Sequence, residues 1–210
     1  MQPLFLSYFI DSDTPVYGGE KDCIKISSIR SISKGDTSNN LQFQFPAHIG
    51  THIDFPYHFA NNGKKSNDYP ASFWIFNEIG FLNCKIENVE NNLDELSSNI
   101  EILILKTGFG CNRNNDIYWS NQPVIPSSLA KLFRNKFPNL RVFGFDMISL
   151  TSKLNRSEGR LAHLSFLIEN DILVLEDMNL LNLEYAPTKI IIAPLLINNA
   201  DGVPCNVIAF

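Results

Sequence analysis

Histidine is rare in this chain of 210 residues, yet three of its four histidines lie within a single short stretch. They are His48, His52 and His58, and Asp54 lies among them. Imidazole nitrogens and carboxylate oxygens are ligands that suit borderline divalent ions such as zinc. The stretch therefore predicts a metal site, with zinc as the first candidate and manganese as its competitor.

Residue character alternates along residues 46–59. His48, His52, Asp54 and His58 occupy even positions, whereas apolar, aromatic and β-branched residues occupy the odd positions from 49 to 59. Successive side chains of an extended chain point to opposite faces, so we expect one packing face and one face that carries the ligands. A straight strand would hold the first two histidines roughly 13 Å apart, so the chain should bend between them, and Gly50 can adopt the required backbone angles.

A simpler interpretation exists for each of these residues taken alone. A lone histidine is usually a surface residue or a hydrogen-bonded core residue, and His163, the fourth histidine, would by itself be interpreted in that way. Three histidines and an aspartate on one face favour a metal site instead. A closed set of four ligands would indicate a structural ion, whereas an open position would indicate catalysis.

The pattern His48-x-Gly50-Thr51-His52-x-Asp54-x-Pro56-x-His58 resembles the signature of the cyclase-like metal-dependent hydrolases, a family that includes bacterial kynurenine formamidases, or arylformamidases. The similarity extends from the Asp-x-x-Thr-Pro-Val-Tyr segment near residue 11 to the C-terminus. The resemblance implies an amide hydrolase with two zinc ions in each subunit, with manganese as the alternative metal. It also implies a swivelling β/β/α-type fold and a homodimer or homotetramer.

The resemblance further implies a role for individual residues. The first metal would be held by His48, His52 and Asp54, and the second by His163, with Asp54 and Glu176 bridging the two. His58 would move the proton, first as a base towards the attacking water and then as an acid towards the leaving nitrogen. Tyr17 would stack on the aromatic part of the substrate.

Two departures from the family pattern affect these assignments. Residues 18–20 are Gly-Gly-Glu, where many relatives carry Pro-Gly-Asp, which changes the expected shape of the substrate pocket. The spacing from His163 to Glu176 is one residue longer than is usual in the family, so we expect an insertion in the turn at residues 168–171. Three neighbouring carboxylates could replace Glu176 if this register is wrong: Glu169, Asp171 and Asp177.

Composition limits the classes of partner and of compartment. The chain has 44% hydrophobic residues, enough to bury a core, and we expect one domain over residues 1–210. A net charge of −5 without a basic run argues against nucleic acid and against an anionic membrane surface, which leaves a small molecule as the partner.

Four widely spaced cysteines without a Cys-x-x-Cys pair indicate reduced thiols in a cytoplasmic protein. Residues 1–10 are predicted to form a first strand rather than a signal peptide.

Periodicity predicts a mixed α and β (α+β) fold in which strands predominate. We expect strands at residues 22–30, 40–46, 79–89, 101–107, 140–146 and 172–175, and a terminal pair at 189–196 and 203–210 joined by an Asp-Gly turn. Helices are expected at 126–137 and 157–170, with a short helix or turn at 91–98. The polar segment at residues 60–70 is a candidate lid over the site or an idle surface loop.

Together the ligand pattern and the family resemblance favour a metal-dependent amidohydrolase, and the resemblance most specifically implies an arylformamidase that hydrolyses N-formylkynurenine to kynurenine and formate. The metal would supply a water of lowered pKa and would polarise the amide carbonyl. Two alternatives stay open: a hydrolase of another amide or of a cyclic imide, as in isatin hydrolases, and a non-catalytic metal-binding protein. The ligand pattern specifies the type of reaction and says little about the substrate.

Overall fold

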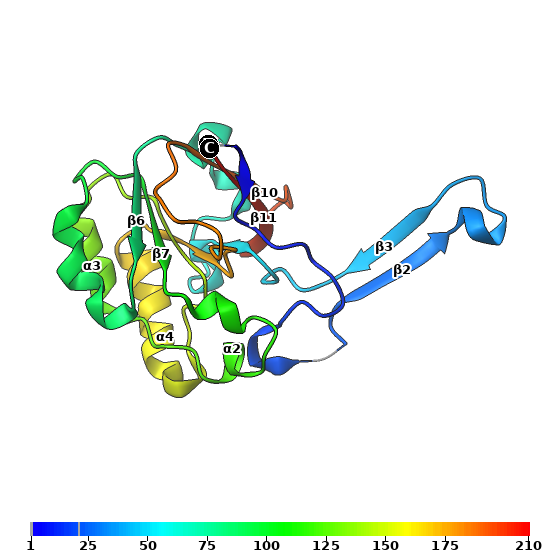
Figure 1. Ribbon diagram of the computed structural model, residues 1–210, viewed down its shortest axis with the longest axis horizontal. Coiled ribbons are helices and arrows are strands. Elements are labelled where there is room, and N and C mark those ends of the chain that lie inside the picture. Colours follow the sequence, from blue (N-terminus) through cyan, green and yellow to red (C-terminus); the bar gives the residue numbers. More distant parts are fainter. Residues whose placement is uncertain (1, 21) are drawn as a thin grey trace.

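The computed structural model describes residues 2–20 and 22–210, and most of the strands in this part of the chain form one large sheet (Figure 1). Its strands, in chain order, are β1 (Leu4–Phe5), β4 (His52–Asp54), β5 (Ile75–Phe76), β6 (Ile79–Asn83), β7 (Ile102–Lys106), β8 (Val142–Phe145), β9 (Leu173–Glu176), β10 (Ile190–Pro194) and β11 (Gly202–Ala209). They are arranged in the order β5-β10-β11-β4-β9-β8-β7-β6, and β1 pairs with β11.

The sheet has a parallel half and an antiparallel half. Strands β6, β7, β8 and β9 run parallel, whereas β4, β11, β10 and β5 pair antiparallel with their neighbours. Strand β4 joins the two halves, because it pairs with β11 on one side and with β9 on the other. The position of β4 brings both halves of the sheet to the predicted site.

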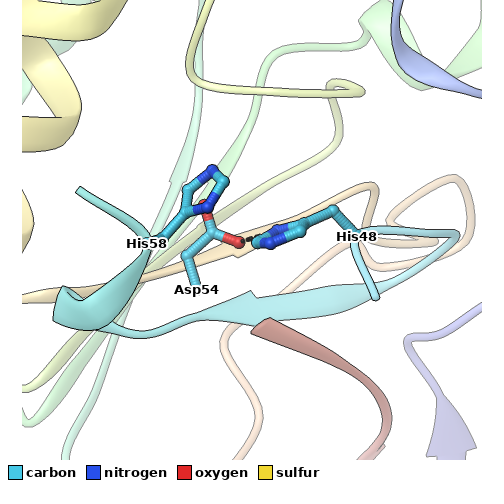
Figure 2. A group of neighbouring side chains, drawn as sticks. All are labelled: His48, Asp54 and His58. Atoms are coloured by element: carbon cyan, nitrogen blue, oxygen red, sulfur yellow. Dashed lines mark hydrogen bonds and ion pairs between the residues drawn. The ribbon is translucent and has the colours of Figure 1, made fainter. Parts of the chain in front are cut away.

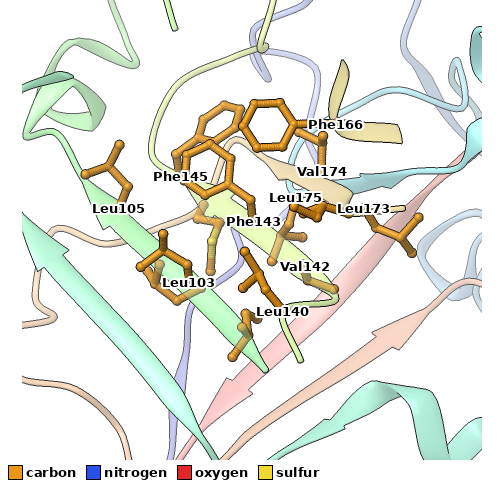
Figure 3. Packing of buried hydrophobic residues seen from close by; sticks show 14 of the residues in the cluster. Leu103, Leu105, Leu140, Val142, Phe143, Phe145, Phe166, Leu173, Val174 and Leu175 are labelled. Atoms are coloured by element: carbon orange, nitrogen blue, oxygen red, sulfur yellow. The ribbon is translucent and has the colours of Figure 1, made fainter. Parts of the chain in front are cut away.

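The parallel half carries the main hydrophobic core (Figure 3). The run Ile102–Leu105 is fully buried, as expected for a strand covered on both faces. Phe143 on β8 stacks on Phe166 with ring centroids 5.2 Å apart. Ile53 on β4 is also fully buried in this core, which fixes the direction in which its neighbours His52 and Asp54 point.

The α-helices are few and short. They are α1 (Val89–Asn92), α2 (Ile117–Ser120), α3 (Ser128–Lys136) and α4 (Arg156–His163), and α4 continues as a π-helix over Leu164–Glu169. Short 3₁₀ turns occupy Tyr17–Gly19, Ile32–Lys34, Pro56–His58, Ser66–Asp68, Ala71–Trp74, Ile86–Asn88, Leu93–Glu95, Phe109–Asn112 and Lys153–Asn155. Across the described residues, every helix is too short or too polar to cross a bilayer.

Strands β2 (Lys25–Arg30) and β3 (Asn40–Gln44) form a separate hairpin that projects away from the rest of the chain (Figure 1). Both strands were predicted, the second from the alternation of Leu41 and Phe43. That alternation does not mark a buried face, because all residues of both strands are exposed. The homo-oligomer expected from the family resemblance stays a prediction, and this hairpin is a surface that such an assembly could cover.

The predicted fold class, mixed α and β with strands predominating, is confirmed, and several predicted boundaries are corrected. The strand expected at 79–89 ends at Asn83, because Ile86, Val89 and Leu93 follow at helical spacing and are buried on one face of the turns there. The segment at 108–122, which its glycine and asparagine content predicts to be a loop, contains α2. The strand expected at residues 1–10 is only Leu4–Phe5, and Met1 lies outside the described residues.

Candidate metal centre

Strand β4 supplies two of the predicted ligands, His52 and Asp54, on the same face of the sheet. The buried Ile53 lies between them and points into the core, so the alternation predicted for these three positions is correct. In the antiparallel pairing, His52 lies opposite Glu176 of β9, and Asp54 lies opposite Gly202 of β11. The sheet therefore places an imidazole and two carboxylates side by side.

His48 approaches Asp54 through a bend rather than along a strand. The extended strand expected over residues 46–59 is wrong, since β4 contains only three residues, but the bend predicted at Gly50 is present with φ of +57°. The bend brings Nδ1 of His48 within 2.8 Å of Oδ1 of Asp54 (Figure 2). Gly202 makes room for this ring, because a side chain at that position would overlap the His48 imidazole.

His58 reaches the site from the 3₁₀ turn Pro56–His58, which begins where pairing of β4 ends. Its ring lies beside that of His48, with centroids 4.0 Å apart (Figure 2). It is more exposed than His52 and His163 and lines the cavity that opens onto the cluster. The strand predicted for this residue is wrong, and its catalytic role stays a prediction.

Glu176 and His163 complete the cluster from distant parts of the chain. Glu176 ends β9 and is buried, with Oε2 3.3 Å from Nε2 of His52 and Oε1 3.5 Å from Nε2 of His163. Asp54 has the same arrangement, with Oδ1 3.4 Å from Nε2 of His52 and Oδ2 3.5 Å from Nε2 of His163. Each carboxylate thus presents one oxygen to His52 and the other to His163, which is the arrangement that bridging two ions requires.

None of the three substitute carboxylates faces these imidazoles. Glu169 and Asp171 are exposed, and Asp171 pairs with Lys64 at the surface. Asp177 is buried, but its oxygens accept hydrogen bonds from Arg113 and from Tyr118. The C-terminal register chosen from the sequence, with Glu176 at the cluster, agrees with the structure.

The helix that carries His163 can accommodate the extra residue noted in the sequence. Beyond His163 the backbone continues as a π-helix over Leu164–Glu169, and π-helical turns contain more residues than α-helical turns. The insertion was expected in the turn at residues 168–171. The structure has a π-helical segment that leads into that turn, and Phe166 and Leu167 of this segment are buried.

In two of the rings, a hydrogen bond at Nδ1 fixes the direction in which Nε2 points. Nδ1 of His52 lies 2.8 Å from the carbonyl oxygen of Gly50, and Nδ1 of His163 lies 2.8 Å from that of Gly159. A carbonyl oxygen can only accept, so each Nδ1 carries the proton and each Nε2 is directed at the carboxylates. Such outer hydrogen bonds are typical of histidines that bind metals.

The charges of the cluster fit a bound cation. Burial alone would lower the pKa of His163, but hydrogen bonds to Asp54 and Glu176 raise it to about 10. Burial likewise opposes charge on His48, yet Asp54 and Asp201 raise its pKa to about 9. The pKa of Asp54 is held well below its usual value by His163 and His48 despite its burial. Two buried carboxylates this close together need compensating positive charge, which protons or metal ions can supply.

We expect the metal-free protein to lose stability as the pH rises from about 6.5 to about 10. The pKa values of His48 and His163 are raised to about 9 and about 10, so the folded state holds protons that the unfolded state has released. Their stabilising contribution is complete below about 6.5 and disappears as the pH passes through the raised values. Thermal unfolding after chelation would measure this effect. The metal-loaded protein, whose protons the ions have displaced, should have a flatter profile, and equal profiles would contradict the expectation.

Asp201 is a site residue that the sequence analysis missed. It directly precedes β11, and its Oδ2 lies 2.9 Å from Nε2 of His48 and 3.2 Å from Nδ1 of His58. The Asp-Gly pair at 201–202 was predicted to form a turn. A turn alone explains why Asp and Gly occur there, so the sequence offered no reason to assign Asp201 to the site. The informative signal is the pairing of β11 with β4, which the sequence alone does not provide.

Replacing Asp201 with asparagine should weaken metal binding by about 10- to 100-fold, the usual effect of removing an outer carboxylate partner of a ligand histidine. The carboxylate orients His48 and also contacts His58, so activity at saturating metal should fall as well. Titration of the metal-free variant with zinc would measure the affinity. Asp171→Asn, which removes a surface carboxylate, is the matched control. Unchanged affinity in Asp201→Asn would show that His48 does not depend on this contact.

The cluster lies in a cavity of about 520 Å³. Tyr17 lines it, as predicted, and so do Glu20, His58 and residues of α4. None of residues 60–70 lines it, which favours the surface-loop interpretation of that segment over the lid. Asp146, which ends the strand predicted at 140–146 and could belong either to the site or to a turn, does not line the cavity; its oxygens accept hydrogen bonds from Thr107 and Gly108, as in an ordinary turn.

Comparisons with known proteins agree with this architecture. The family model described as "Putative cyclase" matches residues 4–151. Kynurenine formamidase of Bacillus cytotoxicus is 28% identical over 208 residues, covering 93% of this chain and 88% of the relative. Kynurenine formamidase of Geobacillus thermodenitrificans is 27% identical over 208 residues, covering 95% and 92%.

Solved structures share the fold across nearly the whole chain. A crystal structure of an isatin hydrolase bound to the product analogue thioisatinate has a TM-score of 0.79 at 14% identity, covering 99% of this chain and 91% of that one. A predicted metal-dependent hydrolase from Bacillus stearothermophilus has a TM-score of 0.76 at 16% identity, covering 99% and 97%.

The site offers groups of histidine and carboxylate side chains that could hold a metal ion. The chain belongs to the putative cyclase family, because the family model matches well over half of it.

Proposed function

We propose that this chain is an arylformamidase that hydrolyses the formamide of N-formylkynurenine to give kynurenine and formate. The observation that carries the proposal is the pair of buried carboxylates, Asp54 and Glu176, each shared between His52 and His163 at the floor of an open cavity. The names of the sequence relatives support this substrate.

The donor set fits two divalent ions, which we propose are zinc, with manganese as the alternative. His48, His52 and one oxygen of each shared carboxylate would hold the first, and His163 with the other two oxygens would hold the second. When bound, such ions lower the pKa of a water molecule to about 7 and polarise the substrate carbonyl. The second ion would then have three protein ligands and an open position for water or substrate, whereas the first would have four.

We propose that His58 moves the proton. Burial lowers its pKa, so the imidazole is neutral at pH 7 and can accept a proton. Its Nδ1 lies 3.2 Å from Asp201, and donation of this N–H to the carboxylate leaves Nε2 as the basic nitrogen. The protonated ring can then donate to the departing aniline nitrogen, which would otherwise leave as an unstable anion.

The size and lining of the cavity suit the aromatic part of the substrate. Its volume of about 520 Å³ is in the range of small-molecule sites and leaves room for an aromatic ring beyond the amide. Tyr17 lines the wall, and we propose that it stacks on that ring, as expected from its place in the sequence.

The test is to assay protein reconstituted with zinc or with manganese, while measuring metal content. The substrates are N-formylkynurenine, formanilide, a small set of other amides, and isatin. We expect turnover of N-formylkynurenine that disappears on chelation and returns with metal. Hydrolysis of isatin alone would indicate a cyclic-imide hydrolase, and failure on the whole panel would leave a metal-binding protein without this activity.

A further inference from the structure

Two arginines lie on the same face of α4 as the site histidine His163. Arg156, Arg160 and His163 follow the spacing i, i+4 and i+7, which places them in one row along the helix. All three line the cavity, with His163 buried at the cluster and the two arginines exposed. The row therefore runs from the proposed metal centre out to solvent.

Neither arginine has a carboxylate partner within the described part of the chain. Two other arginines form ion pairs, Arg113 with Asp177 and Arg141 with Glu101. Glu20 lines the same cavity, but it is not within ion-pair distance of Arg156 or Arg160. The carboxylates of Asp54 and Glu176 at the cavity floor lie beside imidazoles rather than beside these arginines. The positive charge of the two arginines is therefore available to a ligand.

We infer that Arg156 and Arg160 bind a carboxylate on the substrate, and that this enzyme selects acyl anilides that carry an acidic group several bonds away from the scissile amide. This inference rests on the proposed function and names the feature of the substrate that the site recognises. A guanidinium group presents paired N–H donors that match a carboxylate, and it stays charged at all relevant pH values. With the amide at His163, the two arginines lie about one and two helical turns further out, where a side chain extending from the aromatic ring would reach.

The experiment compares two substrates that differ only in the carboxylate. N-formylkynurenine carries it, and N-formylkynuramine, its decarboxylated counterpart, keeps the ring, the ketone and the ammonium group. We expect the double variant Arg156→Gln/Arg160→Gln to lower kcat/KM for N-formylkynurenine by about tenfold or more, mainly through KM, which is the range expected for hydrogen bonds to a charged group. Turnover of N-formylkynuramine should change little.

A matched control separates specific contact from general charge. Lys153 lies just before α4, is stacked on Trp119 and does not line the cavity, so Lys153→Gln removes one positive charge nearby without touching the site. We expect this variant to keep the wild-type preference. An equal loss in Lys153→Gln would show that only the overall field matters, and would overturn the inference.

Binding measurements distinguish failure of the inference from failure of the proposed function. Calorimetry with metal-loaded protein can compare kynurenine with kynuramine, whether or not either formyl compound is hydrolysed. Hydrolysis of both formyl compounds with equal kcat/KM would leave the arylformamidase proposal standing and would overturn the carboxylate contact. If neither compound is hydrolysed, the proposed function fails. In that case a preference for kynurenine that the double variant abolishes still supports the contact, and equal binding of the two compounds rejects it.

Discussion

Asp54→Asn is expected to abolish metal binding and to reduce turnover by at least about 10³-fold, since metal-ion catalysis is worth several kcal/mol. Both oxygens of Asp54 face imidazoles, Oδ1 towards His48 and His52 and Oδ2 towards His163. Asparagine keeps the shape of the side chain but replaces one of these oxygens with an amide group, which cannot bridge two ions. Metal content and activity, measured on the same preparation, should fall together.

Asp171→Asn serves as the control for this variant, because Asp171 is exposed and pairs only with Lys64. Circular dichroism of both variants would establish that the fold is kept. The metal hypothesis would not survive full activity in a metal-free preparation of Asp54→Asn. Loss of one ion with retention of the other would show that Asp54 is a terminal ligand rather than a bridge.

His58→Ala should lower turnover by about 10²- to 10⁴-fold, the usual contribution of general acid–base catalysis, and should leave most of the metal in place. His58 lies at the cavity wall, and its Nδ1 contacts Asp201, whereas the shared carboxylates face the other histidines. In this variant turnover should therefore fall while the metal content stays close to that of the wild-type protein. Added imidazole, which can enter the space left by the ring, should restore part of the activity.

Loss of metal in His58→Ala would assign His58 to the ligand shell instead. The structure makes this a real alternative, because His48, Asp54 and His58 also offer three ligand atoms close enough to hold one ion (Figure 2). The buried group of His52, Asp54 and Glu176 provides the comparison, since substitution of Glu176 should remove the ion of that group and leave an ion held with His58 in place.

Local features of the sequence predicted much of the site. Alternation placed His52 and Asp54 on one face, and Ile53 between them does pack into the core. Gly50 was assigned the bend because distance required one, and its φ is positive. Glu176 was chosen because it ends a buried apolar run, and a strand that ends at the edge of a core carries its last side chain to the site. In each case the prediction depends only on residues close together in the sequence.

The features that the sequence did not reveal depend on contacts between distant segments. Asp201 looks like a turn residue until β11 pairs with β4. Arg156 and Arg160 look like ordinary solvent-exposed residues of a helix until α4 is packed against the cavity. The extended conformation predicted beyond Asp54 was wrong because Pro56 begins a 3₁₀ turn, and that turn, rather than a strand, presents His58.

The position of β4 between the two halves of the sheet has a consequence for the order of folding. Its pairing partners on β9 and β11 lie well over a hundred residues further along the chain, so both ladders close very long loops. Contacts of this kind form slowly, because the entropy of closing the loop is lost before the contacts stabilise the chain. The parallel strands β6 to β8 are closer in sequence and can assemble earlier. Ions held between β4 and β9 would then bind late in folding. They would slow unfolding more than they speed folding.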